Sequence, residues 1–389
     1  MALHIRRRKP TCASTSDKDL AIDAVELQKG TPANRRDAER QREARRILML
    51  ASQAAPLEVE SSQPELKHPA GYRILYSTSE MEDKLEWAAG LTSDASSVVK
   101  KGLERQKKLG SFRRVAQAPE PVLLATLDQD FPNFAEATDA IRKRLHLCRL
   151  APEKLLKLPP ILLDGPPGIG KTAYCLRLSE LFQIRFEVID VSKAGADFSM
   201  IGLDAGYSTG RPGRIWESLS YESMSVMWML DEVDKKSESV RDASVNYLLG
   251  LLEPATAKRF IDNAMQLAID ASYICYVATS NDKSQISGPL LTRFMVFDIA
   301  APTTAQARAI VMSIYRELHR NEDWASAFAD KLSDEIIDAL VSFTPREIHK
   351  RLYDAHATAA SLGRTVLHVS DVSTKTEADN REGRSIGFL

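Results

Sequence analysis

The sequence predicts an α/β protein in which a three-layer domain, built on a parallel sheet, is followed by a small all-helical domain. Three observations support this fold class. Short apolar runs alternate with amphipathic helical segments between residues 160 and 299, which is typical of a parallel sheet covered on both faces. A glycine-rich segment follows the first of those runs. After Pro302 the apolar spacing becomes helical.

Each expected strand is a short, mainly apolar run, and each expected helix carries apolar residues on one face. In chain order the expected strands are 160–164, 186–191, 226–231, 272–280 and 294–299. The helices expected before and between them are 134–150, 171–182, 214–221 and 240–252. The small helical domain is expected to contain 304–320, 334–343 and 345–360.

Residues 1–120 differ from the rest of the chain in charge. They hold 22 Lys and Arg against 17 Asp and Glu, a net charge of +5 (22 − 17), whereas the whole chain has a net charge of −1. We expect a basic, largely helical or partly disordered region here, with one helix over 34–50. The α/β domain is then expected over 121–300, the helical domain over 301–363 and a polar tail over 364–389.

The strongest motif is a glycine-rich loop with the pattern GxxxxGK[ST], set between an expected strand and an expected helix. Its residues are Gly165, Pro166, Pro167, Gly168, Ile169, Gly170, Lys171 and Thr172. Glycine lets a tight loop bring several backbone N–H groups to one phosphate, and the following helix points its positive end at the anion. Lys171 suits contact with the β- and γ-phosphates, and the Thr172 hydroxyl suits Mg²⁺. The motif therefore predicts a P-loop that binds a nucleoside triphosphate.

Two carboxylates, Asp231 and Glu232, follow the apolar run 226–230. Ligands of open α/β sheets bind at the carboxyl ends of the strands, which is where this pair is expected. Asp231 suits a magnesium ion, directly or through water, and Glu232 suits orienting and deprotonating an attacking water. The wider string DEVD, 231–234, also fits a helicase-type acidic box, although later features fit a different class of motor.

Several strings together resemble the AAA+ ATPases and, within them, the ATPase module of Lon protease. They are GPPGIGKT (165–172), GYSTGRPGRI (206–215), LDEVDK (230–235), YLLGLLEP (247–254), VATSN (277–281) and GPLLTRF (288–294). The PGR element and the VATSN and PLLTRF strings narrow the likeness toward Lon. It covers 130–363, and it implies the AAA+ architecture of a P-loop domain followed by a helical lid.

The resemblance implies roles for several polar residues. Asn281 would be the sensor-1 residue that holds the attacking water. Arg293 would be the arginine finger that enters a neighbouring subunit's nucleotide, and Arg346 the sensor-2 residue that touches the γ-phosphate. Arg241 matches an arginine that faces the subunit interface. The expected catalytic set is Glu232, Lys171, Asn281, Arg293 and Arg346.

Plainer interpretations of these residues stay open. Asn281 also fits a turn residue at a strand end, and Arg293 a surface arginine. Arg346 also fits an ion pair on a helix surface, with Glu347 or Asp354 as its partner.

Tyr207 aligns with the aromatic pore-loop residue of Lon-type unfoldases, which grips an extended polypeptide substrate. We expect Gly206 and Gly210 to keep this loop mobile. The match is imperfect because Ser208 stands where Lon has an apolar residue. An exposed turn tyrosine is the plainer interpretation.

The chain also departs from Lon in other respects. Gly250 replaces an acidic residue, residues 1–120 show no Lon substrate-binding domain, and only 26 residues (389 − 363) follow the expected helical domain. We therefore expect a Lon-like motor without its peptidase. Any proteolysis would need a separate peptidase, or an adaptor to one, as a partner.

The resemblance implies an ATPase that uses ATP and Mg²⁺, assembles as a homo-oligomer, most simply a hexameric ring, and remodels or unfolds protein substrates. A nucleic-acid-associated ATPase of the loader or branch-migration type stays open, because 100–114 carries seven basic residues and only one acidic residue, Glu104. A nucleotide-dependent scaffold with slow hydrolysis is a third interpretation.

Cysteine and apolar patterns bear on the compartment. The four cysteines form no CxxC pair, and scattered cysteines in a long chain indicate reduced thiols and the cytoplasm. The apolar runs are far shorter than the ~18 residues that span a bilayer, so we expect no membrane partner. His349 and His356 are expected on a helix surface rather than at a metal.

Overall fold

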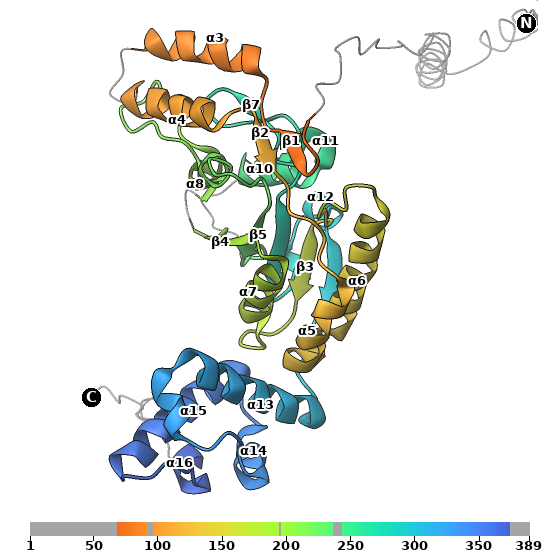
Figure 1. The fold of residues 1–389 in the computed structure, drawn as a ribbon, viewed down its shortest axis with the longest axis vertical. Helices are drawn as coiled ribbons and strands as arrows, with labels where there is room; N and C mark the ends of the chain where they lie inside the picture. The colour runs from red at the N-terminus through yellow and green to blue at the C-terminus, as the bar shows by residue number, and fades with distance from the viewer. Residues whose placement is uncertain (1–67, 92–95, 194–195, 236–242, 374–389) are drawn as a thin grey trace, which may run out of the picture. The chain divides into compact units, whose positions relative to one another are not determined.

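The structure is a computed structural model (Figure 1). It describes residues 68–91, 96–193, 196–235 and 243–373. The helix expected over 34–50, Arg241 and the end of the chain beyond residue 373 lie outside these residues. Within the described residues, no helix combines the length and the apolar character needed to cross a membrane.

A five-stranded sheet lies at the centre of the large domain (Figure 1). Its strands are β3 (Ile161–Asp164), β4 (Arg185–Asp190), β5 (Val226–Asp231), β8 (Cys275–Ser280) and β9 (Met295–Asp298). They lie in the order β4-β5-β8-β3-β9, and each neighbouring pair is parallel. The predicted parallel sheet is therefore confirmed, and the carboxyl ends of its strands meet at one edge.

Helices and short turns connect these strands. The helices of the large domain that follow residue 120 are α5 (Ala125–Asp130), α6 (Ala135–Leu150), α7 (Lys171–Phe182), α8 (Ala196–Ile201), α9 (Arg214–Ser218), α10 (Ala243–Leu252), α11 (Pro254–Ala257) and α12 (Gly288–Leu291). Single 3₁₀ turns span Pro121–Leu124, Pro132–Phe134 and Lys283–Gln285. Two further strands, β6 (Phe260–Ile261) and β7 (Ala268–Ile269), form an antiparallel pair.

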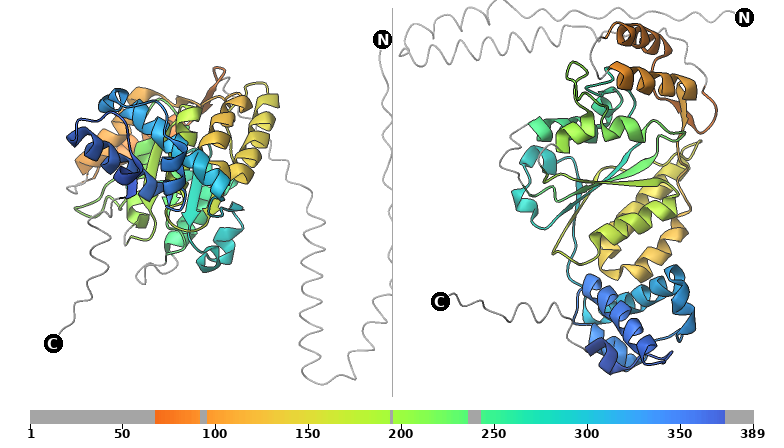
Figure 2. Two further views of the ribbon diagram at one scale, coloured as in Figure 1. Left: turned by 90° about the horizontal axis from the view of Figure 1, so that it is seen from below. Right: turned by 90° about the vertical axis from the view of Figure 1, so that its left-hand side faces the viewer.

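Alternate residues of β5 enter two different hydrophobic cores. Met227 and Met229 pack in the core that contains the buried residues of α6 and α7. Trp228 and Leu230 pack in the core that contains buried residues of α9 and α10. Successive side chains of a strand point to opposite faces, so both faces of the sheet are apolar and both are covered by helices, as Figure 2 shows.

The described part of the region before residue 120 packs on one of these cores. It contains β1 (Tyr72–Ile74), α3 (Thr78–Ala89), α4 (Ser96–Leu109) and β2 (Phe112–Arg114), with β1 and β2 antiparallel. Met81 of α3 and Leu103 of α4 are buried in the same core as Trp228. The domain boundary at residue 120 stays a prediction, but this segment is folded and shares its core with the sheet.

One cation of the basic stretch 100–114 is part of this core. Arg113 is 1% exposed and donates hydrogen bonds to the side-chain oxygen of Gln106 and to the backbone oxygens of Leu109 and Phe112. Burial lowers the pKa of Arg113. Its guanidinium therefore ties β2 to α4 and is not presented to a partner.

The helical domain follows the sheet. It contains α13 (Thr304–Asn321), a 3₁₀ turn (Asp323–Ala327), α14 (Asp334–Leu340), α15 (Pro345–Ser361) and α16 (Val369–Ser373). Capping boxes fix the starts of α13 and α15 through their own first-turn side chains. The domain continues beyond residue 363, where the sequence predicts a polar tail, because Leu367 and Val372 are buried in its core and Arg364 pairs with Asp371 at 2.8 Å.

His356 is not on the helix surface where the sequence analysis expects it. It is 2% exposed and lies against the rings of Tyr315, Trp324 and Phe328. Burial lowers its pKa. The prediction was wrong because the face of α15 that packs in the domain core includes this histidine.

Candidate functional site

The glycine-rich loop lies between the carboxyl end of β3 and the first turn of α7. Gly168, with φ of 79°, and Gly170, with φ of 103°, take left-handed backbone angles that residues with a Cβ atom disfavour. Gly165 is restricted by space, because a Cβ atom there would lie 2.2 Å from the backbone oxygen of Ile299. The loop therefore presents backbone at the start of a helix, where the N–H groups lack intrahelical partners.

Lys171 begins α7 and turns back over the loop. Its ammonium group donates to two backbone oxygens of the loop and to the Oδ1 atom of Asn281, the last at 2.9 Å. Burial lowers the pKa of Lys171, and the nearby carboxylates of Asp164, Asp234 and Asp231 act in the opposite direction. A partly desolvated cation attracts an anion more strongly than a fully hydrated one.

Asp231 and Glu232 lie where β5 ends, beside the polar end of β8. Thr279 of β8 donates its hydroxyl proton to the Asp231 carboxylate, and its oxygen accepts the N–H of Glu232 at 3.4 Å. Glu232 has φ of 58°, a left-handed conformation that is uncommon for a glutamate and typical of functional sites. Its carboxylate accepts a hydrogen bond from Ser192 at 3.3 Å and pairs with Lys235.

Asp234 fixes the segment that follows β8. Its Oδ2 atom accepts the backbone N–H groups of Asn281 at 3.0 Å and Asp282 at 3.1 Å, and its side chain is buried. Asn281 is thereby held with its side chain toward Lys171. The sequence analysis missed the positioning contacts of Asp234 and Thr279. The last acid of the DEVD string was the available signal for Asp234.

These elements line one cavity of about 410 Å³. From the large domain it takes Asp130, Phe131, Asn133, Pro167 to Ala173, Asp231, Glu232, Thr279, Ser280 and Asn281. From the helical domain it takes Ile310, Ser313, Ile314, Glu317, Pro345, Arg346 and His349. The structure thus brings together most of the expected site residues. Gly165 and Pro166 belong to the loop but are not among the lining residues, and Arg293 and Tyr207 lie elsewhere.

Arg346 reaches the cavity from the first turn of α15. It forms no ion pair with any residue that the structure describes, so the interpretation as a partner of Glu347 or Asp354 is not supported. Beside the cavity, Asp130 of α5 accepts a hydrogen bond from Ser313 of α13 at 2.6 Å. This contact joins the helical domain to the large domain next to the proposed ligand.

The residues of the cavity fit a nucleoside triphosphate with magnesium. The loop and Lys171 suit phosphate oxygens, while the Thr172 hydroxyl and the Asp231 carboxylate are the oxygen donors that Mg²⁺ prefers. No group of three or more His, Cys, Asp or Glu side chains that could hold a metal occurs among the described residues. In such a site phosphate oxygens and water would supply the other magnesium ligands. The volume is also that of an ordinary small-molecule site.

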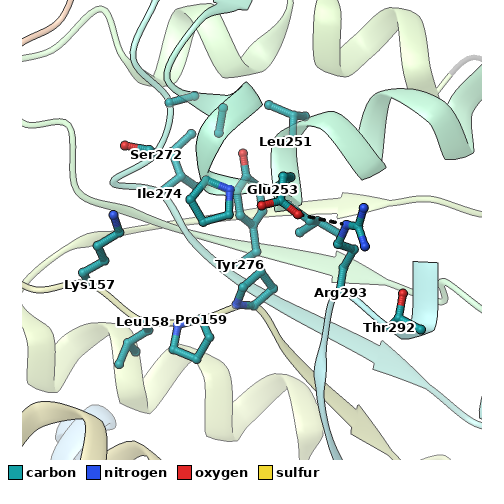
Figure 3. Close-up of a pocket in the computed structure, with 15 residues that line it drawn as sticks. Lys157, Leu158, Pro159, Leu251, Glu253, Ser272, Ile274, Tyr276, Thr292 and Arg293 are labelled. Carbon is teal, nitrogen blue, oxygen red and sulfur yellow. Dashed lines mark ion pairs between the residues drawn. The ribbon is translucent and has the colours of Figure 1, made fainter. Parts of the chain in front are cut away.

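Arg293 lies just before β9, at the amino edge of the sheet, where the strands begin. The cavity described above lies at the opposite, carboxyl edge, where the strands end. Arg293 forms an ion pair with Glu253, with 3.3 Å between Nε and Oε2, as Figure 3 shows. It is not among the residues that line the cavity described above.

Tyr207 lies at the tip of a hairpin between α8 and α9. The hairpin is closed by a bridge between Leu203 and Arg211, and Tyr207 is 64% exposed. A Cβ atom at Gly210 would lie 2.5 Å from the backbone oxygen of Asp204. The N–H of Gly210 donates a hydrogen bond to the backbone oxygen of Tyr207 at 2.9 Å. Gly210 thus permits a tight, hydrogen-bonded turn, which is a different role from the mobility that the sequence analysis expects.

Asp262, just after β6, holds the base of this hairpin. It is 0% exposed, and its carboxylate accepts the N–H groups of Gly213 at 2.7 Å, Ala264 at 2.9 Å and Met265 at 3.1 Å. Burial raises the pKa of Asp262 to about 7, although the three N–H groups act in the opposite direction. The sequence analysis did not single out Asp262, because its neighbours in the chain give no signal of a buried carboxylate.

A protein-family model described as the ATPase family associated with various cellular activities (AAA) matches residues 161–300. These residues run from β3 to the end of β9 and include the glycine-rich loop, the acidic pair, Asn281 and Arg293. Residues 161–300 form an AAA ATPase domain. The AAA domain therefore contains the whole sheet, and the helical domain that follows it supplies Arg346.

Lon proteases are among the curated relatives. Lon protease homolog 2, peroxisomal, of Zea mays is 29% identical over 188 residues, which are 48% of this chain and 21% of that protein. Lon protease 1 of Bacillus subtilis is 26% identical over 234 residues, which are 60% of this chain and 30% of that protein. The chain thus matches about a fifth to a third of the length of these relatives. The predicted likeness of the AAA domain to the Lon ATPase region is confirmed.

The solved structures that resemble the chain include RuvB from Thermotoga maritima. A structure titled as the RuvB Holliday junction branch migration motor aligns with a TM-score of 0.39 and 15% sequence identity, covering 60% of this chain and 66% of that chain. A structure of a RuvB mutant from the same organism aligns with a TM-score of 0.40, also at 15% identity, covering 60% of this chain and 67% of that chain.

Proposed function

We propose that the AAA domain hydrolyses ATP, with Mg²⁺, in the cavity that it shares with the helical domain. The observation that carries this proposal is the convergence of Lys171, Glu232, Asn281 and Arg346 on one cavity of about 410 Å³, although they come from separate parts of the chain. Phosphoryl transfer needs mainly positioning and charge stabilisation, which such a set of side chains supplies.

Glu232 is the proposed base. It would orient the attacking water and accept its proton. The Ser192 hydroxyl and the Thr279 contact to its backbone hold it at the edge of the cavity. Magnesium held by Thr172 and Asp231 would neutralise charge on the β- and γ-phosphates.

Lys171 and Asn281 are proposed to act in sequence. In the structure the Lys171 ammonium donates a hydrogen bond to the Oδ1 atom of Asn281. Phosphate oxygens that attract Lys171 would release this oxygen, which could then accept a hydrogen bond from the attacking water. Arg346 would contact the γ-phosphate from α15 and thereby make the angle of the helical domain depend on the bound nucleotide.

Arg293 is proposed to complete the site of a neighbouring copy. Its place at the opposite edge of the sheet from the cavity supports a role in trans, where a cation stabilises charge on the transferring phosphoryl group. An assembly in which every copy gives Arg293 to the next is most simply a closed ring, and we propose a hexamer.

The proposed task of the motor is protein remodelling or unfolding. Tyr207 supports it, because a 64% exposed aromatic ring on a tight hairpin offers a contact that tolerates many polypeptide sequences. The hairpin is anchored at its base by Asp262 and Gly213. Movement of the anchored segment would therefore carry the ring with it.

A nucleic-acid-associated motor is the second candidate, and one surface of the structure favours it. The exposed cations of α4 are Lys100, Lys101, Arg105, Lys107 and Lys108. Next to them, Tyr221 lies under the guanidinium groups of Arg105, at 5.2 Å, and Arg185, at 3.9 Å. Cations beside an aromatic ring suit a phosphate backbone with unstacked bases.

The two candidates differ in which tyrosine matters. We propose to measure steady-state ATPase activity with an unfolded protein or with single-stranded DNA, in the wild type, Tyr207→Ala and Tyr221→Ala. Protein remodelling predicts stimulation by the unfolded protein that Tyr207→Ala abolishes and Tyr221→Ala preserves. Stimulation by DNA alone at physiological salt, lost in Tyr221→Ala, would overturn it in favour of the second candidate.

A further inference from the structure

A second cavity, of about 400 Å³, lies at the edge of the sheet opposite the nucleotide cavity. Its walls come from the segment before β3, the start of β8, the α10–α11 junction and the residues just before β9. Figure 3 shows the ring of Tyr276 near the middle of this cavity, with Lys157 on one side and Arg293 on the other. Neither the AAA match nor the proposed ATPase cycle gives it a ligand.

Two of the residues that line it carry a buried hydroxyl oxygen without a hydrogen-bond partner among the described residues. They are Tyr276, which is 4% exposed, and Ser272. A buried hydroxyl without a partner destabilises a fold, and phenylalanine would fill the same space without that cost. Burial also raises the pKa of Tyr276, so its hydroxyl remains a proton donor. A tyrosine at this position therefore points to an acceptor atom that the described residues do not supply.

The charges of the lining define the ligand further. Lys157 and Arg293 are basic, and Glu253 is the one acid among the residues that line this cavity. The rest of the lining is mainly apolar and includes Leu158, Leu251, Leu252 and Ile274. Hydroxyl donors and excess positive charge favour an anion, and apolar walls favour a ligand with an apolar body over a strongly hydrated phosphate.

We propose that this cavity binds a carboxylate carried on an apolar body, with the Tyr276 hydroxyl donating to the carboxylate and Arg293 as its counter-ion. Two kinds of ligand share this chemistry. One is the C-terminal carboxylate of a polypeptide whose last residue is apolar, and the other is a small apolar acid. The carboxylate competes with Glu253, whose Oε2 atom lies 3.3 Å from Nε of Arg293. Binding therefore changes the position of Arg293. An effect of this change on ATP turnover rests on the function proposed above.

Binding to the full chain can be measured by isothermal titration calorimetry. The probes are 4-phenylbutyrate and its neutral amide, together with N-acetyl-Leu-Phe as the free acid and as the amide. We expect both acids to bind and both amides to fail. The tighter acid identifies the source of the ligand, a peptide end or a small acid.

Tyr276→Phe tests the assignment of the hydroxyl. We expect it to weaken binding of the acids by about tenfold or more, while its Tm equals or exceeds that of the wild type because no hydrogen bond within the described residues is lost. Tyr315→Phe is the matched control. Its hydroxyl donates to the backbone oxygen of Ala329 in the helical domain, so this variant should lose Tm and keep the affinity for the acids.

Two results would overturn the proposal: no binding of either acid to the wild type at millimolar concentration, or equal affinities in the wild type and Tyr276→Phe. Turnover is measured in parallel with 4-phenylbutyrate present. Inhibition supports the link to Arg293. Binding without any effect on turnover supports the cavity and counts against the role of Arg293 in the neighbouring site.

Discussion

At the carboxyl edge of the sheet polar side chains are paired with one another, whereas at the amino edge two hydroxyls have no partner among the described residues. Lys171 is bonded to Asn281 and Asp231 to Thr279, while the unpartnered hydroxyl oxygens of Tyr276 and Ser272 are buried beside a cavity that also takes Lys157, Glu253 and Arg293. A paired network is already oriented for a polyanion with a metal. At the other edge we propose that a ligand satisfies these donors, so that the same sheet would offer two sites of different chemistry.

The largest expected effect comes from the amino edge. Arg293→Ala should lower ATP turnover by about 10³-fold and leave nucleotide binding intact, because the arginine acts on a neighbour's transition state and not on its own cavity. The measurement is steady-state ATPase activity together with nucleotide affinity. Mixing this variant with Glu232→Gln subunits should restore part of the activity. Absence of recovery, under conditions where mixed oligomers form, would contradict the role in trans.

Asp262 tests whether pairing with N–H groups suffices to keep a buried carboxylate charged. Its pKa is raised to about 7, against about 3.9 in an unfolded chain. At a pH between these two pKa values, Asp262 is protonated in the folded chain and ionised in the unfolded chain. The free energy of unfolding should therefore fall as the pH rises from about 4 to about 7, by up to about 4 kcal/mol.

The control for this pH dependence is Asp262→Asn, which removes the titrating group. Urea unfolding between pH 5 and pH 8 should show a smaller pH dependence in Asp262→Asn than in the wild type. Identical slopes in the two proteins would show that the three N–H groups keep the carboxylate ionised throughout.

Gly165→Ala tests the close contact behind the phosphate loop. The new Cβ atom would lie 2.2 Å from the backbone oxygen of Ile299, so we expect a loss of about 3 kcal/mol in the free energy of unfolding. Gly250→Ala is the matched control, because nothing lies within 4 Å of its Cβ position on α10. That change should stabilise the protein slightly. Equal effects of the two substitutions in chemical unfolding would contradict the contact.

Asn281→Ala tests the paired network at the carboxyl edge. We expect turnover to fall by about 10²-fold with little change in the free energy of unfolding, because the side chain positions water while Asp234 still binds the backbone N–H at residue 281. Asn321→Ala, at the exposed end of α13, serves as the control in the same ATPase assay. Unchanged turnover in Asn281→Ala would remove the proposed role of the amide.

The sequence predicts those parts of the fold that depend on local interactions. The glycine-rich loop between β3 and α7 and the acids at the end of β5 are local patterns, and the structure has these elements within about one residue of the predicted bounds. A largely helical or partly disordered region was expected before residue 120, but the bounds of α3 and α4 were not predicted, because their apolar residues are few and become buried only against the distant sheet. The burial of Arg113, Asp262 and His356 likewise depends on residues far away in the chain.

The same argument applies to the two cavities. The one that holds Lys171 could be predicted because its residues occur in short strings with a known chemistry. The one that holds Tyr276 could not, because an unpaired hydroxyl becomes visible only when the surrounding residues have been placed. Its ligand chemistry follows from four separate segments that no single motif joins.

The central claim is that this chain binds and cleaves ATP at the carboxyl edge of its sheet. The most direct test measures MgATP binding and phosphate release by the wild type and Glu232→Gln, with and without EDTA. We predict that both proteins bind MgATP, that Glu232→Gln releases phosphate at least about 10²-fold more slowly, and that EDTA stops turnover. A wild-type protein that neither retains nor cleaves the nucleotide, or a Glu232→Gln variant as fast as the wild type, would contradict this claim.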